Sequence, residues 1–530
     1  MRREWIISGL TASLLALCVV IGDRINSSVA SAPTVTARGV VFDDENGNQQ
    51  FDAGETLLPN VRVSNGVDIV LTADDGRYEL PVHDDTILFV IKPRGYRTPL
   101  SDDLLPQFYY IHKPAGSPDS KFPGVAPTGD LPPSVDFPLT AQDEPEQFQA
   151  ILFGDTQSRN QQEVDYMAHD VIEEMIGIDA AFGVTLGDIV FNDLSVMEPH
   201  NRTIALLGIP WYNVIGNHDI NYDARDRHYA NETFERVYGP SYYSFDYGPA
   251  HFLVLDDIKW HLNDKGKWTY VGGFGADQIA FVKRDLELIP ADQLVVLLMH
   301  IPLDDTEDQQ AIYRLIEQRP FCISISGHTH FQEHRFITEA DGWRGPQPHH
   351  HIVNVTVCGS WWSGTPDERG IPHTVMRDGA PNGYSLIAFD GRDYRIDYVP
   401  SGRPREYQMQ IYAPEVVAAE ALAETEILVN VFAGSERSKV EMRIGEGAWQ
   451  ALTKMEVPDP AYEAVVAREA ELLELKKEAW TALPKIMNSP HIWGGKLPDG
   501  IEPGTHAIEV RETDMFGAVH RARRVIRVRE

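Results

Sequence analysis

The sequence predicts an α/β protein, with a central domain of sheets flanked by helices between an N-terminal all-β domain and a C-terminal β-sandwich-like domain. The chain has 530 residues, of which 43% are hydrophobic and 10% aromatic, as in folded globular proteins. At roughly 150 residues per domain, this length predicts three or four domains. Short hydrophobic strands alternate with helical segments from Phe148 to Tyr398, whereas both flanking regions show the period-two alternation typical of β-strands.

The first 32 residues predict a signal peptide for export. Arg2 and Arg3 precede an apolar run over residues 5–22, and an Ala-Ser-Ala cleavage site follows at residues 30–32. Cleavage would leave a periplasmic or extracellular protein without a membrane span. The apolar run, about 18 residues, is long enough for a retained N-terminal anchor, which stays the alternative. The paired arginines leave both the general secretory and the twin-arginine export routes open.

Turns and linkers divide the rest of the chain into three predicted domains. A β-sandwich domain spans residues 33–142 and ends at a Pro-rich stretch followed by an acidic linker. The central domain spans residues 143–400. Residues 401–530 are again β-rich, and a charged amphipathic helix at Tyr462–Trp480 is inserted among their strands.

The central domain is predicted to begin with a buried strand and a long helix at Gln161–Ile178, whose apolar residues recur at helical spacing. Hydrophobic strands that alternate with helices indicate a sheet covered on both faces. The predicted strands are Ala150–Phe153, Gly183–Leu186, Trp211–Ile215, Phe252–Leu255, Leu294–Met299, Phe321–Ile325, Ile352–Val357, Ser385–Phe389 and Tyr394–Tyr398.

Net charge and cysteine content exclude some classes of function. The formal charge of −33 would repel nucleic-acid backbones, so general nucleic-acid binding is not expected. A phosphate-binding site on such a chain needs a local positive field, which bound metal ions would supply. After signal cleavage only Cys322 and Cys358 remain, and both lie in apolar runs, which predicts two buried free thiols.

Five polar blocks directly follow predicted strands of the central domain. They are Gly154-Asp155-Thr156-Gln157, Gly187-Asp188, Gly216-Asn217-His218-Asp219, Met299-His300 and Gly327-His328-Thr329-His330. Each block alone is weak, because Gly-Asp and Gly-Asn pairs are common in turns. Five such blocks in order predict a shared site, since ligands of α/β sheets gather at the carboxyl ends of strands.

Carboxylate, imidazole and amide oxygen are all donors to divalent first-row metals, and one Asp can bridge two ions. Two ions ~3.5–4 Å apart can hold a hydroxide between them and stabilise the attacking and leaving oxygens of a phosphoester. The blocks therefore predict a two-metal centre that cleaves phosphoester bonds.

The ordered blocks resemble the calcineurin-like metallophosphoesterase family over about residues 149–398, and the flanking domains are similar to bacterial members with N- and C-terminal β domains. The resemblance implies a metallophosphoesterase-type β-sandwich core flanked by helices. It also implies that His218 hydrogen-bonds the phosphoryl group or protonates the leaving oxygen, with Asp219 orienting it. The implied ligands are Asp155, Gln157, Asp188 and His330 for the first metal, and Asp188, Asn217, His300 and His328 for the second.

The chain departs from the usual family pattern at two places. Gln157 stands where the family usually has histidine, and this weaker, harder donor favours Mn²⁺ over Zn²⁺, with Fe²⁺ or Mg²⁺ as alternatives. The same variant resembles manganese-dependent hydrolases of nucleotide diphosphates. The family often has a second acid soon after the Gly-Asp block, and here Asn192 and Asp193 are the candidates.

Other aromatic and histidine residues suggest weaker hypotheses. An aromatic wall for the organic part of a substrate is one interpretation of Trp361, Trp362 and Tyr384, and core packing is the other. His251 is predicted to lie in the core or behind the metal ligands. The triplet His349-His350-His351 is expected in a solvated loop before a strand, with an approach to the metals as the alternative.

The N-terminal domain contains a candidate calcium loop. Oxygen-bearing residues fall at loop positions 1, 3, 5, 7, 9 and 12, although Gln49 replaces the usual glycine at position 6. A plain acidic hairpin is the alternative. The candidate ligands are Asp44, Asn46, Asn48, Gln50, Asp52 and Glu55.

Three functions compete. The first is a two-metal phosphomonoesterase or phosphodiesterase acting on a phosphorylated small molecule or an envelope phosphoester. The second is a nucleotide pyrophosphatase, suggested by Gln157. The third is a non-catalytic surface-binding protein, which would have no need for seven candidate metal ligands.

Overall fold

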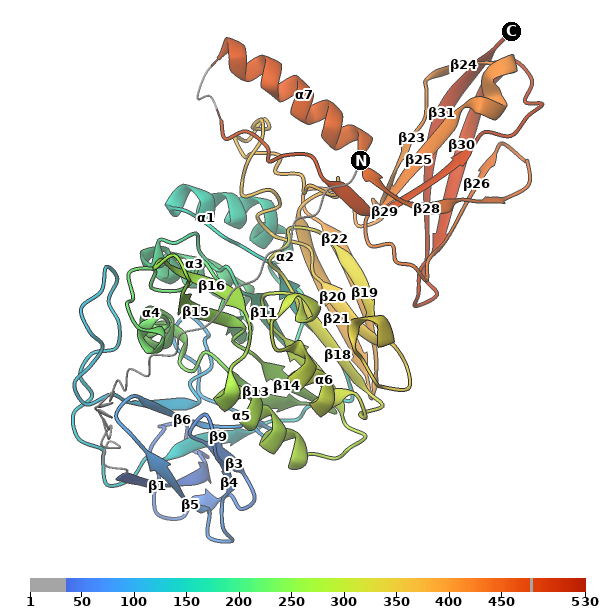
Figure 1. The fold of residues 1–530 in the computed structure, drawn as a ribbon. Helices are drawn as coiled ribbons and strands as arrows, with labels where there is room; N and C mark the ends of the chain where they lie inside the picture. The colour runs from blue at the N-terminus through green and yellow to red at the C-terminus, as the bar shows by residue number, and fades with distance from the viewer. Residues whose placement is uncertain (1–34, 477–479) are drawn as a thin grey trace, which may run out of the picture.

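The computed structural model describes residues 35–476 and 480–530, so the predicted signal peptide lies outside the described residues. Three parts follow one another along the chain, and Figure 1 shows the central one between the two β-rich ends. Among the described residues, no helix combines the length and the apolar character that a membrane span requires.

Two sheets packed face to face form the central part (Figure 1). The first has the strand order β12-β11-β10-β21-β22 and the second the order β13-β14-β17-β18-β20-β19. The first comprises β10 (Gln147–Phe153), β11 (Phe182–Leu186), β12 (Trp211–Val214), β21 (Gly383–Asp390) and β22 (Asp393–Pro400). The second comprises β13 (Tyr243–Tyr247), β14 (Ala250–Val254), β17 (Leu294–Leu298), β18 (Cys322–Ser326), β19 (Glu333–Ile337) and β20 (His349–Val353).

Strand β10 shows why its hydrophobic run predicts burial on both faces. Ala150 and Leu152 face the core between the sheets, where Phe252 of β14 packs against rings of the first sheet. The alternate residues Ile151 and Phe153 face a second core under the helices on the outer side. Because the side-chain period of a strand is two, this double burial requires apolar residues at every position.

Helices cover the outer face of each sheet. Helices α1 (Gln161–Met167), α2 (Glu173–Met175), α3 (Met197–Ile204) and α4 (Glu232–Tyr238) lie over the first sheet, and α5 (Ala276–Glu287) and α6 (Gln309–Ile316) over the second. A π-helical turn at Ala168–Ile172 joins α1 to α2, so the predicted helix ends at Met175 instead of Ile178. The metallophosphoesterase-type sandwich with flanking helices is confirmed.

The N-terminal part, residues 35–141, consists of two small sheets. One has the order β2-β1-β9-β7 with β5 on β1, and the other has the order β4-β3-β6-β8. The strands are β1 (Val35–Asp43), β2 (Thr56–Leu57), β3 (Arg62–Ser64), β4 (Ile69–Leu71), β5 (Arg77–Val82), β6 (Thr86–Val90), β7 (Tyr96–Arg97), β8 (Tyr109–His112) and β9 (Phe137–Ala141).

A buried ion network joins the N-terminal part to the second central sheet. Arg62 of β3 contacts Asp246 and Asp285 at 2.5 and 2.8 Å, and both carboxylates also contact His251, at 2.7 and 3.0 Å. Burial alone would lower the pKa of His251, but Asp285 and Asp246 raise it above its usual value. His251 therefore lies in the core, as predicted, and holds two parts of the molecule together.

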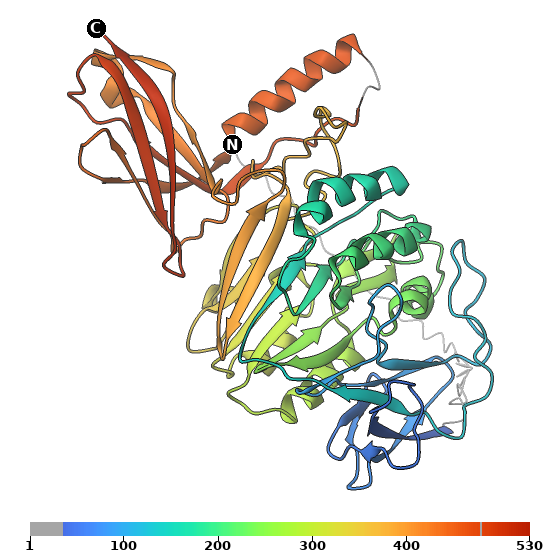
Figure 2. The ribbon, with the colours of Figure 1, turned by 180° about the vertical axis from the view of Figure 1, so that it is seen from behind.

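The C-terminal part is a sandwich of two sheets, β23-β25-β29-β28 and β24-β31-β30-β26-β27 (Figure 2). Helix α7 (Pro460–Leu475) is inserted between β28 and β29 and ends before the predicted Trp480. The strands are β23 (Met409–Tyr412), β24 (Val416–Ala418), β25 (Glu426–Val431), β26 (Lys439–Ile444), β27 (Gln450–Ala451), β28 (Thr453–Pro458), β29 (Asn488–Lys496), β30 (Gly504–Thr513) and β31 (Val519–Arg529).

The histidine triplet is not in a solvated loop, so that prediction was wrong. His349, His350 and His351 belong to β20 and are all buried. His349 and His351 hydrogen-bond Ser324 at 2.8 and 2.7 Å, and burial lowers the pKa of His349 to about 3. A neutral imidazole has one nitrogen that donates a hydrogen bond and one that accepts, and a hydroxyl group can do both. Hydrogen bonds to such partners make buried histidines tolerable in this strand.

Cys322 and Cys358 are free thiols, as predicted, but only Cys358 is fully buried. Cys358 is buried beside the polar blocks, whereas Cys322 at the start of β18 is partly exposed.

Candidate metal centre

The polar blocks meet where strands of the two central sheets end. Asp155, Asp188 and Asn217 follow β10, β11 and β12 of the first sheet, and His300 and His328 follow β17 and β18 of the second. The first three strands run parallel to one another, as do β17 and β18, so the blocks of each sheet share an edge. Packing of the two sheets then brings the two sets of side chains together.

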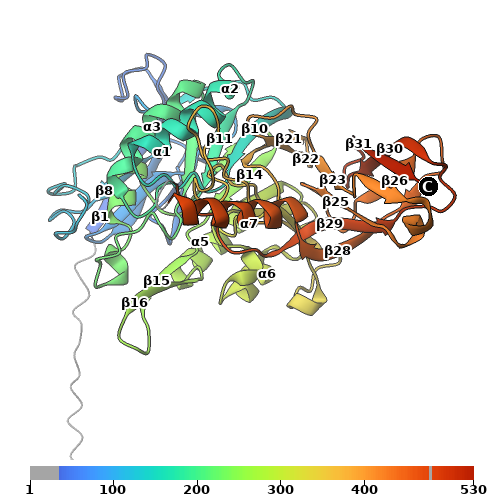
Figure 3. The same ribbon diagram turned by 90° about the horizontal axis from the view of Figure 1, so that it is seen from above.

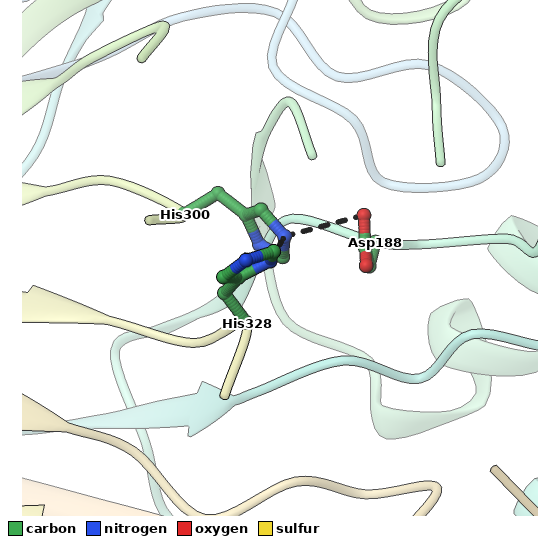
Figure 4. A group of neighbouring side chains, drawn as sticks. All are labelled: Asp188, His300 and His328. Carbon is green, nitrogen blue, oxygen red and sulfur yellow. Dashed lines mark hydrogen bonds and ion pairs between the residues drawn. The ribbon is translucent and has the colours of Figure 1, made fainter. Parts of the chain in front are cut away.

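One group of ligands is centred on His300 (Figure 4). Its Nε2 lies 3.3 Å from Asp188 Oδ1, 3.2 Å from Asn217 Oδ1 and 3.1 Å from His328 Nδ1. The ligand atoms of Asp188, His300 and His328 all lie within 4.8 Å of one another. Asp188 and His300 are buried and His328 is partly buried. Because water has little access to this carboxylate and these imidazoles, their polar atoms must be satisfied by one another or by a bound cation.

A second group lies around Asp155. His330 Nε2 is 3.3 Å from Asp155 Oδ2, an oxygen that is buried and accepts no hydrogen bond. Gln157 donates through Nε2 to Asp188 Oδ2 at 2.9 Å, so the two oxygens of Asp188 face different groups. A half-turn of the Gln157 amide would present its oxygen instead. The unpaired carboxylate oxygen and the shared Asp188 fit the donor set of two adjacent divalent ions.

Backbone carbonyls fix the direction of two imidazoles. His300 Nδ1 donates to the carbonyl of Leu186 at 2.8 Å, and His330 Nδ1 donates to that of Gly359 at 2.5 Å. The remaining Nε2 atom of each ring then points its lone pair into the site. Outer partners of this kind usually orient metal-binding histidines.

Strained backbone is concentrated at the same residues. Positive φ angles occur at five of the predicted ligands, namely Asp155 (27°), Gln157 (44°), Asp188 (49°), His328 (73°) and His330 (56°). Each such conformation costs on the order of 1–3 kcal/mol and persists only where its surroundings require it. Here the tight turns at the strand ends require these conformations, because they direct the side chains into the site.

The glycines before the ligands leave room for the other ligands. A Cβ on Gly216 would lie 2.4 Å from Asp188 Oδ1, and one on Gly327 would lie 2.4 Å from Asp155 Oδ1. Neither carboxylate could keep its place beside an alanine. The Gly-Asn and Gly-His pairs in the sequence therefore reflect packing between blocks, in addition to turn formation.

The charges within the site are strongly coupled. Burial lowers the pKa of His328 to about 4, and the neighbouring His300 adds to the decrease. Burial would also lower the pKa of His300, but Asp188 outweighs it and raises this pKa to about 10. Burial would raise the pKa of Asp188, but His300 and His218 bring it below its usual range. A cation bound here would take the place of the proton shared by this carboxylate and imidazole.

The structure corrects the expected pairing of His218 with Asp219. The Asp219 carboxylate accepts hydrogen bonds from the backbone amides of Ile189, Val190 and Gly216 at 2.8–3.1 Å. It is buried and ties the loops after β11 and β12 together, so it is not free to orient an imidazole.

His218 is oriented by Asn192 instead. Its Nδ1 lies 2.8 Å from Asn192 Oδ1, and Phe191 stacks on the ring at 4.3 Å. Of the two candidates that follow the Gly187-Asp188 block, Asn192 therefore reaches the site, whereas Asp193 caps the short helix at Leu194–Val196. A neutral amide supplies the same fixed orientation without adding negative charge.

Only one member of the predicted aromatic wall borders the centre. Trp361 stacks on the ring of His330 at 3.9 Å. Trp362 is buried and donates to the carbonyl of Thr156 at 3.1 Å, and Tyr384 packs on Phe153 in the core. The core-packing alternative therefore holds for Trp362 and Tyr384.

Sequence reasoning missed two tyrosines at the centre. Tyr270, on the hairpin of β15 (Ile258–Leu262) and β16 (Trp268–Gly272), meets the ring of His328 edge-on at 6.5 Å. This hairpin projects from the body of the molecule (Figure 3). Tyr222, which is 40% exposed, hydrogen-bonds the side chain of Asn217 and follows the Gly-Asn-His-Asp block by three residues. This spacing indicates Tyr222 in the sequence, whereas no sequence pattern indicates Tyr270.

The candidate calcium loop stays a prediction. Asp44 accepts hydrogen bonds from the amides of Gly47 and Asn48, and Asp52 accepts from the side chains of Asn46 and Asn48. These bonds close the loop and are compatible with both a plain acidic hairpin and a loop that wraps an ion.

Comparison with known proteins identifies the family of the chain. Residues 150–332 match the family model of calcineurin-like phosphoesterase, residues 44–124 that of its N-terminal domain and residues 351–520 that of its C-terminal domain. Among solved structures, the chain is similar to the purple acid phosphatase PPD1 from yellow lupin (Lupinus luteus) seeds. The identity is 12%, the TM-score is 0.36, and the match covers 70% of this chain and 67% of the lupin chain. A comparison with curated proteins gave no match. The chain therefore belongs to the calcineurin-like phosphoesterases, a family of metal-dependent phosphoester hydrolases, in a form that carries N- and C-terminal domains.

Proposed function

We propose that this enzyme hydrolyses phosphomonoesters or phosphodiesters with two divalent ions, held by the two ligand groups that share Asp188. The observation that carries the proposal is the position of the Asp188 carboxylate. One oxygen faces His300 and the other faces Gln157, which is the arrangement of a bridging ligand. When bound, the ions would supply an ionised water near neutral pH and neutralise charge on the phosphoryl oxygens.

His218 supplies the proton for the leaving oxygen in this proposal. Its Nδ1 is held by Asn192, and its ring is held by Phe191, so Nε2 is the free atom. The backbone amide of His218 donates to Asp188 Oδ1 at 2.8 Å, which fixes the ring relative to the metal ligands. General acid catalysis requires this combination of a fixed ring and a free nitrogen.

Gln157 favours Mn²⁺ among the candidate ions, because an amide oxygen is a harder and weaker donor than imidazole; Fe²⁺, Mg²⁺ and Zn²⁺ are the alternatives. The same residue supports a nucleotide pyrophosphatase as the second candidate function. The proposed setting is outside the cytoplasm, after removal of the signal peptide, where a phosphorylated small molecule or an envelope phosphoester would be the substrate.

The function is tested by turnover of p-nitrophenyl phosphate, bis-p-nitrophenyl phosphate and ADP-ribose by protein stripped of metal and reloaded with Mn²⁺, Fe²⁺, Mg²⁺ or Zn²⁺. We expect hydrolysis of at least one ester, with Mn²⁺ the best metal, and no hydrolysis by the stripped protein. Cleavage of ADP-ribose alone would favour the pyrophosphatase. Metal binding without turnover of any of the three would contradict the proposal.

Replacing His218 with alanine is expected to lower kcat by about 10²–10⁴-fold, the usual contribution of a general acid. The loss should be larger for an alkyl phosphate than for p-nitrophenyl phosphate, because the nitrophenolate leaves without being protonated. Both kcat values are measured with metal content checked in parallel. His228→Ala, at an exposed histidine, is the control. Equal losses for the two substrates would argue against proton donation by His218.

A further inference from the structure

A groove lies beside the metal centre, between the N-terminal part and the loop after β12. It has a volume of about 410 Å³ and is lined by Lys121, Phe122, Asn192, Ile220, Tyr222, Asp223 and Arg225. Asn192 is also the residue that holds His218, so the groove opens on the side of the centre where the leaving oxygen receives its proton. None of the predicted ligands lines this groove.

The N-terminal part contributes Lys121 and Phe122 to this groove. They lie between β8 and β9, in a segment that runs along the central domain near α4 (Figure 1). Ser117 hydrogen-bonds Glu232 of α4, and Arg236 of the same helix donates to the carbonyl of Pro123 at 3.1 Å. These contacts fix the segment, so the position of Lys121 is determined by the docked N-terminal part.

The charges of the groove favour an anion. Its one acid, Asp223, already accepts hydrogen bonds from the Ser120 hydroxyl at 2.9 Å and the Lys121 backbone amide at 2.8 Å. The Lys121 ammonium lies over the Phe122 ring at 4.6 Å, and Arg225 is exposed. The chain has a net charge of −33, but the lining of this groove contains two cationic side chains and one carboxylate and is therefore locally positive.

We propose that this groove is a subsite for a leaving group that itself carries a phosphate, with Lys121 and Arg225 binding that phosphate. The aromatic faces of Phe122 and Tyr222 suit the organic part of the same group. Substrates of this class are diphosphates and diesters whose products both carry phosphate. The inference rests on the proposed function, because it uses the side from which His218 delivers its proton.

The test is binding, measured by calorimetry on the metal-loaded protein with two probes that are not turned over during the titration. The first is α,β-methylene-ADP, which carries two phosphoryl groups. The second is the 5′-methylenephosphonate analogue of AMP, which carries one phosphoryl group and has no ester bond that the enzyme could hydrolyse. In the wild-type protein, the first should bind more tightly than the second. Lys121→Ala and Arg225→Ala should each reduce the affinity for α,β-methylene-ADP by roughly 5–10-fold and change that for the AMP analogue much less, as for lost charge-assisted hydrogen bonds.

Lys283→Ala is the matched control, because it removes an exposed lysine of α5 outside the groove. An unchanged ratio of the two affinities in both groove variants would overturn the subsite. This holds if neither affinity changes and also if both fall by the same factor, because equal weakening would indicate a general electrostatic field and no selective phosphate contact. Turnover of p-nitrophenyl phosphate by the wild-type protein is measured separately, so failure of the subsite is distinguishable from failure of the proposed hydrolysis.

Discussion

Asp188→Asn should lose nearly all phosphoesterase activity, with kcat/KM at least about a thousandfold lower, which corresponds to about 4 kcal/mol of transition-state stabilisation. The reason is geometric. The two oxygens of Asp188 face His300 on one side and Gln157 on the other, and asparagine retains only one oxygen of the two. The variant should also bind fewer metal ions per chain, measured by elemental analysis after reloading and desalting.

Asp193→Ala is the control for this variant. Asp193 lies on the same loop, but its carboxylate accepts hydrogen bonds only locally, from Ser195, so its loss should leave turnover and metal content close to those of the wild type. Comparable thermal midpoints would show that the Asp188 variant is folded. An Asp188→Asn enzyme with full activity, or an Asp193→Ala enzyme without activity, would contradict the assignment of the bridging carboxylate.

Arg62→Ala is expected to reduce the free energy of unfolding by about 3–5 kcal/mol, the usual cost of breaking a buried ion pair from one side. Arg62 neutralises Asp246 and Asp285, and its removal leaves both carboxylates buried with only His251 between them. The side chains of Arg62 and Asp285 are 9% and 0% exposed, so water cannot take the place of the guanidinium. Urea denaturation measures the effect.

Arg38→Ala gives the comparison for the Arg62 variant within the same domain. Arg38 pairs with Glu79 at 2.8 Å, the same distance as the Arg62–Asp285 pair, but both side chains are more than 60% exposed. Exposed pairs contribute little because water and salt screen them, so this variant should unfold close to the wild type. A similar loss in both variants would mean that burial is not what makes the Arg62 network matter.

The location of each predicted ligand at a strand end could be predicted from the sequence, because it depends on local pattern. A hydrophobic strand such as β10 must end in a turn, and a polar residue after that turn, such as Asp155, lies at the sheet edge whatever the rest of the chain does. The blocks at Asp188, Asn217, His300 and His328 follow the same rule, and all of them meet in the structure.

Contacts between loops could not be found in this way. Asp219 is adjacent to His218 in the chain, yet three backbone amides of neighbouring turns take its carboxylate, and Asn192, far away in sequence, holds the imidazole. Tyr270 meets His328 only because the β15–β16 hairpin holds it beside the centre. Such partners are selected by hydrogen-bond satisfaction and close packing after the sheets have met, and sequence adjacency carries no information about either.

The sequence by itself determined the family, the sandwich of sheets and the positions of the seven predicted metal ligands, because strand periodicity and the residues after each strand are local properties. Only the tertiary structure decided which residue orients His218, which aromatic side chain borders the predicted metal centre and where the N-terminal part docks. Asn192, Trp361 and Arg62 owe their roles to neighbours more than 25 positions away in the chain, at sites that exist only once the two sheets and the N-terminal part have packed together.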